Sequence, residues 1–187
     1  MHRVVNNDTL TQWPVNDKPQ GISVKSVHNV LVTCREVSKI KEFTFEGNLV
    51  RVITLQNDIK NPFHTIELTP DTYVVCHGVP GDQLHRVCIV DSVGHVRQSY
   101  GGMKRSDEVH LNTPERLALS DNIYVSDINN DRVLILSRTL SHIGEVLSDL
   151  RVPSRIWFDE QTARLYVADN TWDNGKYVSG CVKVYKV

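Results

Sequence analysis

The stretch Tyr124-Val125-Ser126-Asp127-Ile128-Asn129-Asn130-Asp131-Arg132-Val133 decides the fold. Its two ends are rich in β-branched and aromatic residues, which favour extended strands. Its middle is a run of Asn and Asp, whose short side chains stabilise tight turns. The stretch therefore predicts two antiparallel strands joined by a tight turn.

Runs of the same kind recur along the chain. The segment Tyr124-Val125-Ser126-Asp127 aligns with three others, which are Leu31-Val32-Thr33-Cys34, Tyr73-Val74-Val75-Cys76 and Tyr166-Val167-Ala168-Asp169. Their central valines, Val32, Val74, Val125 and Val167, are 42, 51 and 42 residues apart. A near-constant period of this length is typical of repeat architectures.

Each run has matching neighbours on both sides. A short strand precedes it and opens with a proline, at Pro19, Pro62, Pro114 and Pro153, with Pro62 one place early in this register. A third strand follows each run, and three units add a fourth strand, at 49–55, 96–100 and 142–147. This pattern predicts an all-β fold, a β-propeller of four-stranded antiparallel blades with about four blades in the chain. An all-β sandwich has similar strands but no reason for a fixed repeat.

The third unit resembles the core of an NHL repeat, whose pattern is roughly V-x-D-x-x-N-x-R-V. Asp127, Asn130, Arg132 and Val133 stand at the matching positions. The other units are degenerate, since the aspartate is replaced by Cys34 and Cys76, and the arginine by Lys39 and Cys181. From about residue 19 on, the chain is similar to the propellers that end tripartite-motif ubiquitin ligases and brain-tumour-type translational repressors. We expect structural roles for Asp127, Asn130, Arg132 and Asp169, with the arginine pairing with the aspartate across the hairpin.

The repeat predicts a single propeller domain over residues 1–187. Its blades cover 19–58, 62–107, 114–150 and 153–187, and the last is incomplete after its third strand. Residues 9–15 read as an orphan outer strand, which would close a four-bladed ring by completing the last blade and pairing its exposed edge. The alternative is a fragment of a six-bladed NHL propeller, the blade number that the resemblance favours. An open ring would expose apolar blade faces and associate with itself.

The composition excludes several classes of protein. The chain has 187 residues, 40% of them hydrophobic, and a formal net charge of −1. It is therefore neither disordered nor attracted as a whole to nucleic acid or an anionic membrane, and its apolar runs are too short to span a bilayer. Its cysteines lie far apart without a C-x-x-C pair, which argues for free buried thiols in a reducing, cytoplasmic compartment: Cys34, Cys76, Cys88 and Cys181.

No catalytic motif stands out, so we expect no catalytic residue, no cofactor and no metal. A histidine cluster on the axis would be made by His64, His77 and His85, although turn or surface positions are the simpler interpretation. We expect Trp157 and Phe158 to be core aromatics. Binding residues are expected on the face with the longest loops, because extended loops on a rigid scaffold often bind partners: Arg35, His77, His85, Lys104, Arg105, Trp172, Lys176 and Tyr177.

These expectations favour a non-enzymatic scaffold, the partner- or substrate-recognising NHL propeller of a tripartite-motif-like protein. Any ligase activity would lie in RING or B-box domains, which are absent from this sequence. The first alternative is RNA binding, permitted by the resemblance to translational repressors, but the slightly acidic charge of the long-loop face argues against it. The second is a metal-dependent propeller enzyme, similar to lactonases or an amidating lyase.

Overall fold

The computed structural model describes residues 12–25, 29–103, 110–146, 149–173 and 176–187. In these residues the first sheet contains β1 (Pro19–Lys25), β2 (Asn29–Cys34), β3 (Lys39–Thr44) and β4 (Leu49–Thr54). The second sheet contains β5 (Pro62–Thr69), β6 (Thr72–His77), β7 (Leu84–Asp91) and β8 (Val96–Met103). The third sheet contains β9 (Pro114–Leu119), β10 (Ile123–Asp127), β11 (Arg132–Leu136) and β12 (His142–Val146), with the short 3-10 helix η1 (Ile128–Asn130) in its middle hairpin. The last sheet contains β13 (Pro153–Asp159), β14 (Arg164–Asp173) and β15 (Lys176–Lys186).

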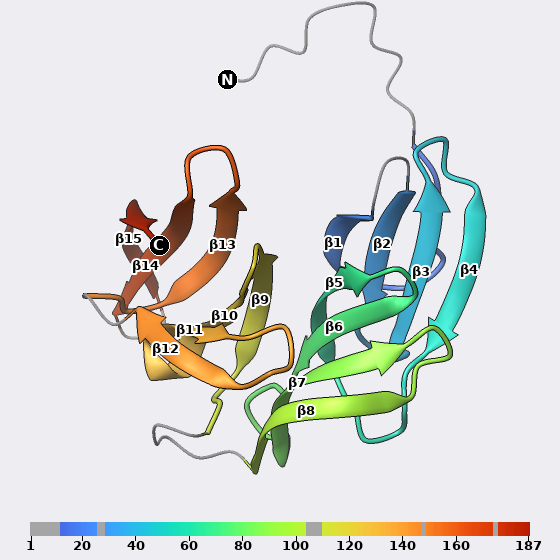
Figure 1. Ribbon diagram of the computed structural model, residues 1–187, viewed down its shortest axis with the longest axis horizontal. Helices are drawn as coiled ribbons and strands as arrows, with labels where there is room; N and C mark the ends of the chain where they lie inside the picture. The colour runs from blue at the N-terminus through green and yellow to red at the C-terminus, as the bar shows by residue number, and fades with distance from the viewer. Residues whose placement is uncertain (1–11, 26–28, 104–109, 147–148, 174–175) are drawn as a thin grey trace, which may run out of the picture.

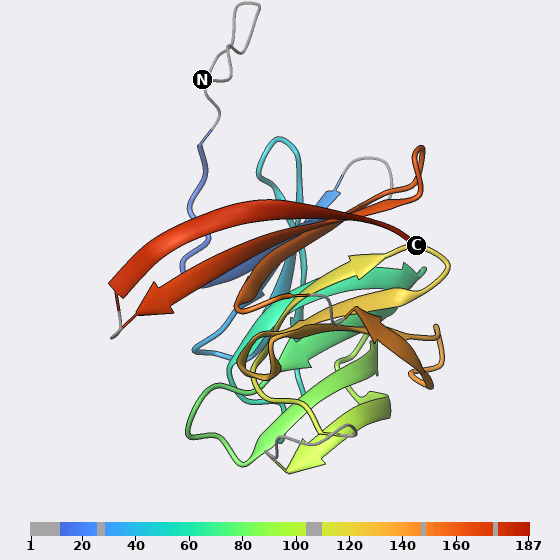
Figure 2. The same cartoon turned by 90° about the vertical axis from the view of Figure 1, so that its left-hand side faces the viewer.

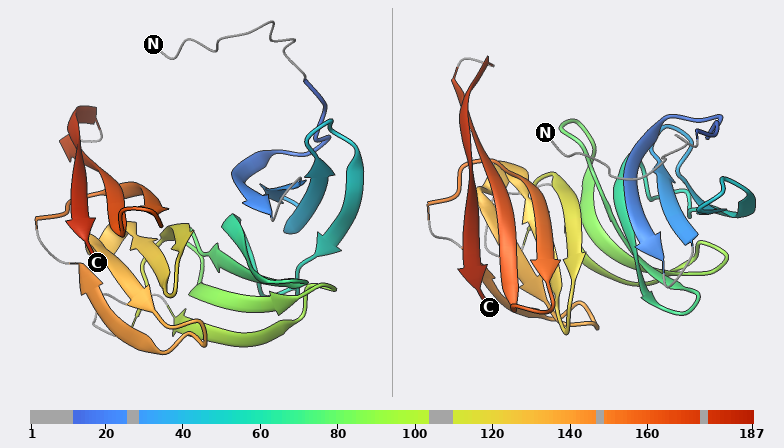
Figure 3. Two further views of the ribbon diagram at one scale, coloured as in Figure 1. Left: turned by 45° about the horizontal axis from the view of Figure 1, so that its top comes forward. Right: turned by 90° about the horizontal axis from the view of Figure 1, so that it is seen from above.

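The four sheets are the blades of a β-propeller, as the repeat predicts. In each sheet the strands are antiparallel and neighbours in sequence are neighbours in space, as Figures 1 and 2 show. The first strands of successive blades, β1, β5, β9 and β13, lie side by side around a common axis. Figure 3 shows that the blades form an arc, with the first and last blades on either side of its open side.

Apolar side chains fill the space between successive blades. Leu31, Ile40 and Ile53 of the first blade pack on Tyr73 and Val75 of the second. Two further clusters join the second blade to the third and the third to the fourth, with the β-branched and aromatic residues of alternating strand positions facing each other. The arc is therefore held by three interfaces, each shared by adjacent blades.

The two blade faces at the open side differ in how they are covered. Trp13 and Val15 pack against Val30, Val32 and Phe43 on the first blade. The segment 12–15 therefore lies on the first blade and forms no strand, while residues 9–11 of the expected orphan strand lie outside the described residues. On the last blade, Trp157, Val182 and Val184 are exposed.

A β-bulge occurs at the same place in all four blades, where the first strand opens. In the first three blades the repeat proline pairs with the last residue of the second strand: Pro19 with Cys34, Pro62 with His77 and Pro114 with Asp127. In the fourth blade Pro153 pairs with Asp169, and the longer β14 continues beyond it to Asp173. His77, and not Cys76, therefore stands at the aspartate position of the second blade, and Pro62 is in register. The sequence alignment was wrong by one residue there because the consecutive Val74 and Val75 match the pattern in either register.

The hairpin of the third blade holds its motif residues as expected. Arg132 Nε donates to Asp127 Oδ2 at 3.0 Å, and Asn130 Nδ2 donates to the same oxygen at 2.7 Å. Asp127 Oδ1 accepts the Asn112 N–H at 2.7 Å, so the carboxylate joins the hairpin to the preceding segment. In the fourth blade Asp169 accepts two backbone N–H groups in the same way. Cys181 stands at the arginine position, and Lys183, two residues further along β15, forms the ion pair with Asp169 instead.

The thiols differ in their exposure. Cys34, Cys76 and Cys88 are free and buried, whereas Cys181 is free and exposed, so the expectation of burial is wrong for Cys181. Burial raises the pKa of Cys76 and of Cys88 to about 12, which leaves both as unreactive thiols. Across the described residues, we find no helix with the length and apolar character to cross a bilayer.

Candidate functional site on the propeller axis

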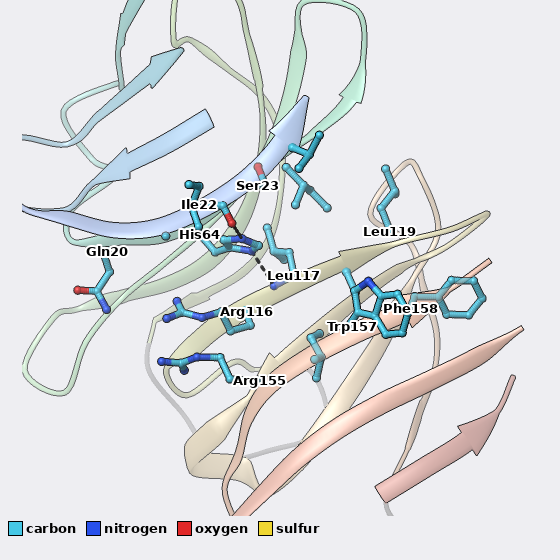
Figure 4. Close-up of a pocket in the computed structure, with 15 residues that line it drawn as sticks. Gln20, Ile22, Ser23, His64, Arg116, Leu117, Leu119, Arg155, Trp157 and Phe158 are labelled. Carbon is cyan, nitrogen blue, oxygen red and sulfur yellow. Dashed lines mark hydrogen bonds between the residues drawn. The ribbon is translucent and has the colours of Figure 1, made fainter. Parts of the chain in front are cut away.

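The first strands of all four blades line a cavity of about 540 Å³ on the axis. Figure 4 shows that its two ends differ in chemistry. Arg116 and Arg155 extend side by side at one end, whereas Trp157 and Phe158 lie at the other. We call this cavity the axial groove.

Four equivalent positions define the polar end of the axial groove. These are Gly21, His64, Arg116 and Arg155, each two residues after the repeat proline of its blade. Each pairs with the residue just before the proline's own partner on the second strand: Thr33, Cys76, Ser126 and Ala168. The common bulge therefore brings one residue from each blade to the same level of the axis. The signal was present in the sequence, because the spacing from the proline is the same in every unit.

His64 joins three blades through its ring. Nε2–H donates to the Ile22 carbonyl oxygen at 3.1 Å, and Nδ1 accepts the Leu117 N–H at 3.2 Å. These two bonds require a neutral ring that carries its proton on Nε2. Burial lowers the pKa of His64 to about 4 and keeps the ring neutral at physiological pH. His64 is therefore a bridge between blades.

Gly21 makes room for this bridge, and its replacement by alanine is expected to destabilise the fold. A Cβ at Gly21 would lie 2.4 Å from Phe63 O and 3.1 Å from His64 Cα, so β1 and β5 would have to separate. We expect Gly21→Ala to lower the free energy of unfolding by about 2 kcal/mol, measured by urea denaturation. Gly144→Ala is the control, because its Cβ would enter open space. Equal stability of the two variants would contradict the close approach of β1 to β5 at Gly21.

Arg116 and Arg155 share one carboxylate. Glu115 Oε1 lies 2.8 Å from Arg155 Nη1 and 3.4 Å from Arg116 Nη2. Arg116 is 9% exposed, whereas the side chain of Arg155 is 58% exposed. Burial lowers the pKa of Arg116, Glu115 opposes this effect, and the charge of Arg155 reinforces it. The polar end thus carries two guanidinium charges against one carboxylate, with His64 neutral.

The histidines expected to bind a partner are buried. His77 ends β6 and His85 lies in β7, and both rings are fully buried, so the expected surface positions are wrong. His85 Nδ1 accepts the Thr113 N–H at 2.8 Å, and His77 Nε2 accepts from Arg86 Nε at 3.3 Å. His64, His77 and His85 form no metal-binding group, and among the described residues no cluster of His, Cys, Asp or Glu does so.

The other expected binding residues are placed only in part. Arg35 is half-buried in the turn after β2, and its guanidinium lies 5.0 Å from the centre of the Phe63 ring. Lys104 and Arg105 lie outside the described residues. Trp172, Lys176 and Tyr177 belong to the paired strands β14 and β15, so the segment expected to be a long loop is mostly a longer hairpin. Its β-branched and aromatic residues favour continued pairing.

Trp157 corrects the expectation of a core aromatic. Its side chain is 61% exposed on β13 and lines the axial groove, with its ring centre 5.3 Å from that of Tyr166. Phe158 packs against the core and stacks on Tyr124. Adjacent strand residues face opposite sides of a sheet, and here one side meets the third blade while the other meets the open side of the arc.

Comparisons with known proteins support the fold. No family model matches the sequence, and no curated protein matches it. A solved structure of the nidogen/laminin complex is similar over 81% of this chain and 56% of that chain, with a TM-score of 0.63 and 18% identity. Virginiamycin B lyase from Staphylococcus aureus is similar over 90% of this chain and 55% of its own, with a TM-score of 0.55 and 12% identity.

A third similar structure is a protein of unknown function from Bacteroides caccae. It matches 90% of this chain and 62% of its own length, with a TM-score of 0.52 and 11% identity. The likeness is one of fold. The chain spans between 55% and 62% of the lengths of these three proteins.

Proposed function

We propose that the chain is a non-enzymatic binding module that holds a protein or peptide partner in the axial groove. The observation that carries this proposal is Trp157, an aromatic side chain 61% exposed on a rigid inner strand. Across the groove, Ile22 and Val24 of β1 are 64% and 70% exposed. Apolar side chains gain free energy when a partner removes them from water, and tryptophan is enriched among the residues that dominate binding.

A protein partner fits this surface better than a small substrate does. The groove is long, since it is lined by strands from all four blades, and its apolar side chains lie on both the first and the last of them. A peptide segment could contact both blades at once, with its backbone along the axis. The nidogen/laminin structure, a complex of two proteins, supports a binding role for a chain of this fold.

The proposal extends to the family and to the face with the long hairpin. We propose an NHL-type propeller of the kind found in tripartite-motif proteins, supported by the bonds that Asp127 receives from Asn130 and Arg132. Arg35 and the hairpin that carries Trp172, Lys176 and Tyr177 would add contacts beside the axis. A cytoplasmic location is part of the proposal, supported by free thiols at Cys34, Cys76 and Cys88.

Self-association is a second mode of binding that the same surfaces would support. Trp157, Val182 and Val184 of the last blade are exposed, as are Ile22 and Val24 of the first. Two arcs could cover these faces by placing the first blade of one copy against the last blade of the other, in an isologous pair. Partner and second copy would then compete for the groove.

The replacement Trp157→Ala tests the proposed function. Peptides selected from a random displayed library on the immobilised chain should bind the variant at least about tenfold more weakly, because the aromatic anchor is lost. Thermal stability should change little, because the ring is mostly in water. Isothermal titration calorimetry measures the binding and a thermal melt measures the stability.

The matched control is Val93→Ala, which removes an exposed apolar side chain from the turn between β7 and β8. It should bind the selected peptides as the wild type does. If no peptide is enriched on the wild-type chain, or if Trp157→Ala binds them unchanged, the axial groove is not the docking surface.

A further inference from the structure

At the polar end of the axial groove the charges of the side chains do not balance. Arg116 and Arg155 come from equivalent positions of adjacent blades, and both approach the same oxygen of Glu115. Arg116 Nη1 also donates to the Glu115 carbonyl oxygen at 3.1 Å, and Arg155 Nη1 to the Ser154 carbonyl oxygen at 2.6 Å. Among the described residues, one guanidinium charge therefore lacks a balancing carboxylate at this place.

Burial makes this imbalance energetically important. Arg116 is 9% exposed and lines the groove, so water screens its charge poorly. His64, the next residue at the same level, is neutral because burial lowers its pKa to about 4, and it neither adds charge nor removes any. An anion that enters the groove would compensate the poorly screened charge of Arg116 and restore the charge balance.

The shape of the site selects among anions. Guanidinium groups are planar and donate in a fixed fork, which matches the two oxygens of a carboxylate. The guanidinium groups lie at one end of the groove, and apolar side chains from β1 and β13 continue from them toward the other end, as Figure 4 shows for Ile22 and Trp157. Such a surface suits a single carboxylate attached to an apolar or extended chain better than a run of phosphates does.

We propose that Arg116 and Arg155 form an anion site on the axis that takes one carboxylate of a bound peptide. That a peptide supplies this carboxylate rests on the proposed function, whereas the anion site itself does not. Trp157 would hold the adjoining apolar part of the ligand, so the two ends of the groove would recognise different parts of one chain. The partner would then present an Asp or Glu side chain, or a C-terminal carboxylate.

Small carboxylates test the site without any selected peptide. The full chain is titrated with N-acetylglutamate amide, with N-acetylalanine and with the neutral N-acetylglutamine amide, and the Arg Nε–Hε resonances are followed by NMR. We expect the first two compounds to shift the Arg116 and Arg155 resonances and the neutral one to leave them unchanged. The tighter of the two carboxylates identifies a side chain or a chain terminus as the source.

Three variants of the site and one control have distinct expected effects on carboxylate binding. Arg155→Gln should weaken carboxylate binding about tenfold and still fold, since Arg155 is largely exposed, while Glu115→Gln should tighten it about threefold by removing the competing carboxylate. Arg97→Gln is the control, because Arg97 is an exposed arginine that pairs with Asp91 away from the axis. Arg116→Gln should lose binding as well, with its folding checked by the thermal melt.

Several results would overturn the site. Equal shifts with the glutamine compound would mean that charge is not recognised, and unchanged binding by Glu115→Gln would mean that Glu115 does not compete. Tighter binding of a short single-stranded RNA than of either carboxylate would assign the arginines to phosphates. If carboxylates bind as expected but no displayed peptide is enriched, the anion site stands and the proposed peptide-binding function fails.

Discussion

Lowering the pH from about 7 to about 4 is expected to reduce the free energy of unfolding by about 3 kcal/mol through His64 alone. In the folded chain Nδ1 of His64 accepts the Leu117 N–H, so a proton on Nδ1 would face another donor. Burial lowers the pKa of His64 to about 4, whereas the unfolded ring takes up a proton near its ordinary pKa of 6.5. The unfolded state therefore binds more protons in this window.

The sign and the limits of the effect follow from the two pKa values. The contribution of His64 to stability is complete above about pH 6.5, falls as the pH decreases, and levels off below about pH 4. Burial also lowers the pKa of His77 to about 4, which adds a loss in the same window. Together they approach the whole stability of an ordinary domain, so the chain should unfold at about pH 4 to 5.

Urea unfolding at a series of pH values measures this effect. His64→Gln, which can keep one donor and one acceptor, should lose stability at pH 7 but show a shallower fall toward pH 4. His95→Gln is the control, because His95 is an exposed histidine whose removal should leave the slope unchanged. A slope in His64→Gln as steep as in the wild type would show that another group controls the acid transition.

Arg132→Ala is expected to lower the free energy of unfolding by about 3 kcal/mol. Arg132 donates to Asp127 at 3.0 Å, to Glu145 at 3.1 Å and to the His110 carbonyl oxygen at 2.8 Å. The Asp127 side chain is fully buried and that of Arg132 nearly so, which makes the loss of one partner costly. Asp127 keeps its bonds from Asn112 and Asn130, and this limits the loss.

The fourth blade provides the comparison for this variant. Lys183 forms the ion pair with Asp169, the equivalent of Asp127, but its side chain is more exposed than that of Arg132, so Lys183→Ala should have a smaller effect. Urea denaturation of both variants gives the two values, and peptide binding in the axial groove should remain in Arg132→Ala, because the pair lies in the middle hairpin of its blade. A loss below about 1 kcal/mol for Arg132→Ala would mean that water or a neighbour satisfies Asp127 equally well.

The sequence was sufficient for the blades because strand periodicity and turn chemistry are local. Pro19, Pro62, Pro114 and Pro153 mark the start of every blade, and each opens a strand in the structure. The pairing of Arg132 with Asp127 was also predictable, since both residues belong to one tight hairpin. Sequence signals of this kind are local, so they can be interpreted without information on how the blades pack.

The axial groove was not predictable in the same way because it depends on contacts between distant residues. Trp157 is a large aromatic residue of the kind that usually lies in a core, yet in the structure it lines the groove and is 61% exposed. His77 and His85 lie at the two ends of the loop between β6 and β7, and for that reason they resemble surface residues in the sequence. In the structure both are fully buried. Arg116 and Arg155 are 39 residues apart in sequence, and the bulge is what aligns them.

The shared bulge gives the polar end of the axis one equivalent position in every blade. Each blade contributes one residue there, and the four contributions are Gly21, His64, Arg116 and Arg155. The cores between the blades are built from other strand positions. Gly21 and His64 hold adjacent blades together, whereas Arg116 and Arg155 face the groove. A chain of this architecture could therefore change what it recognises by exchanging the two side chains from the third and fourth blades, so duplication of such a blade would copy the scaffold and leave its specificity free to diverge.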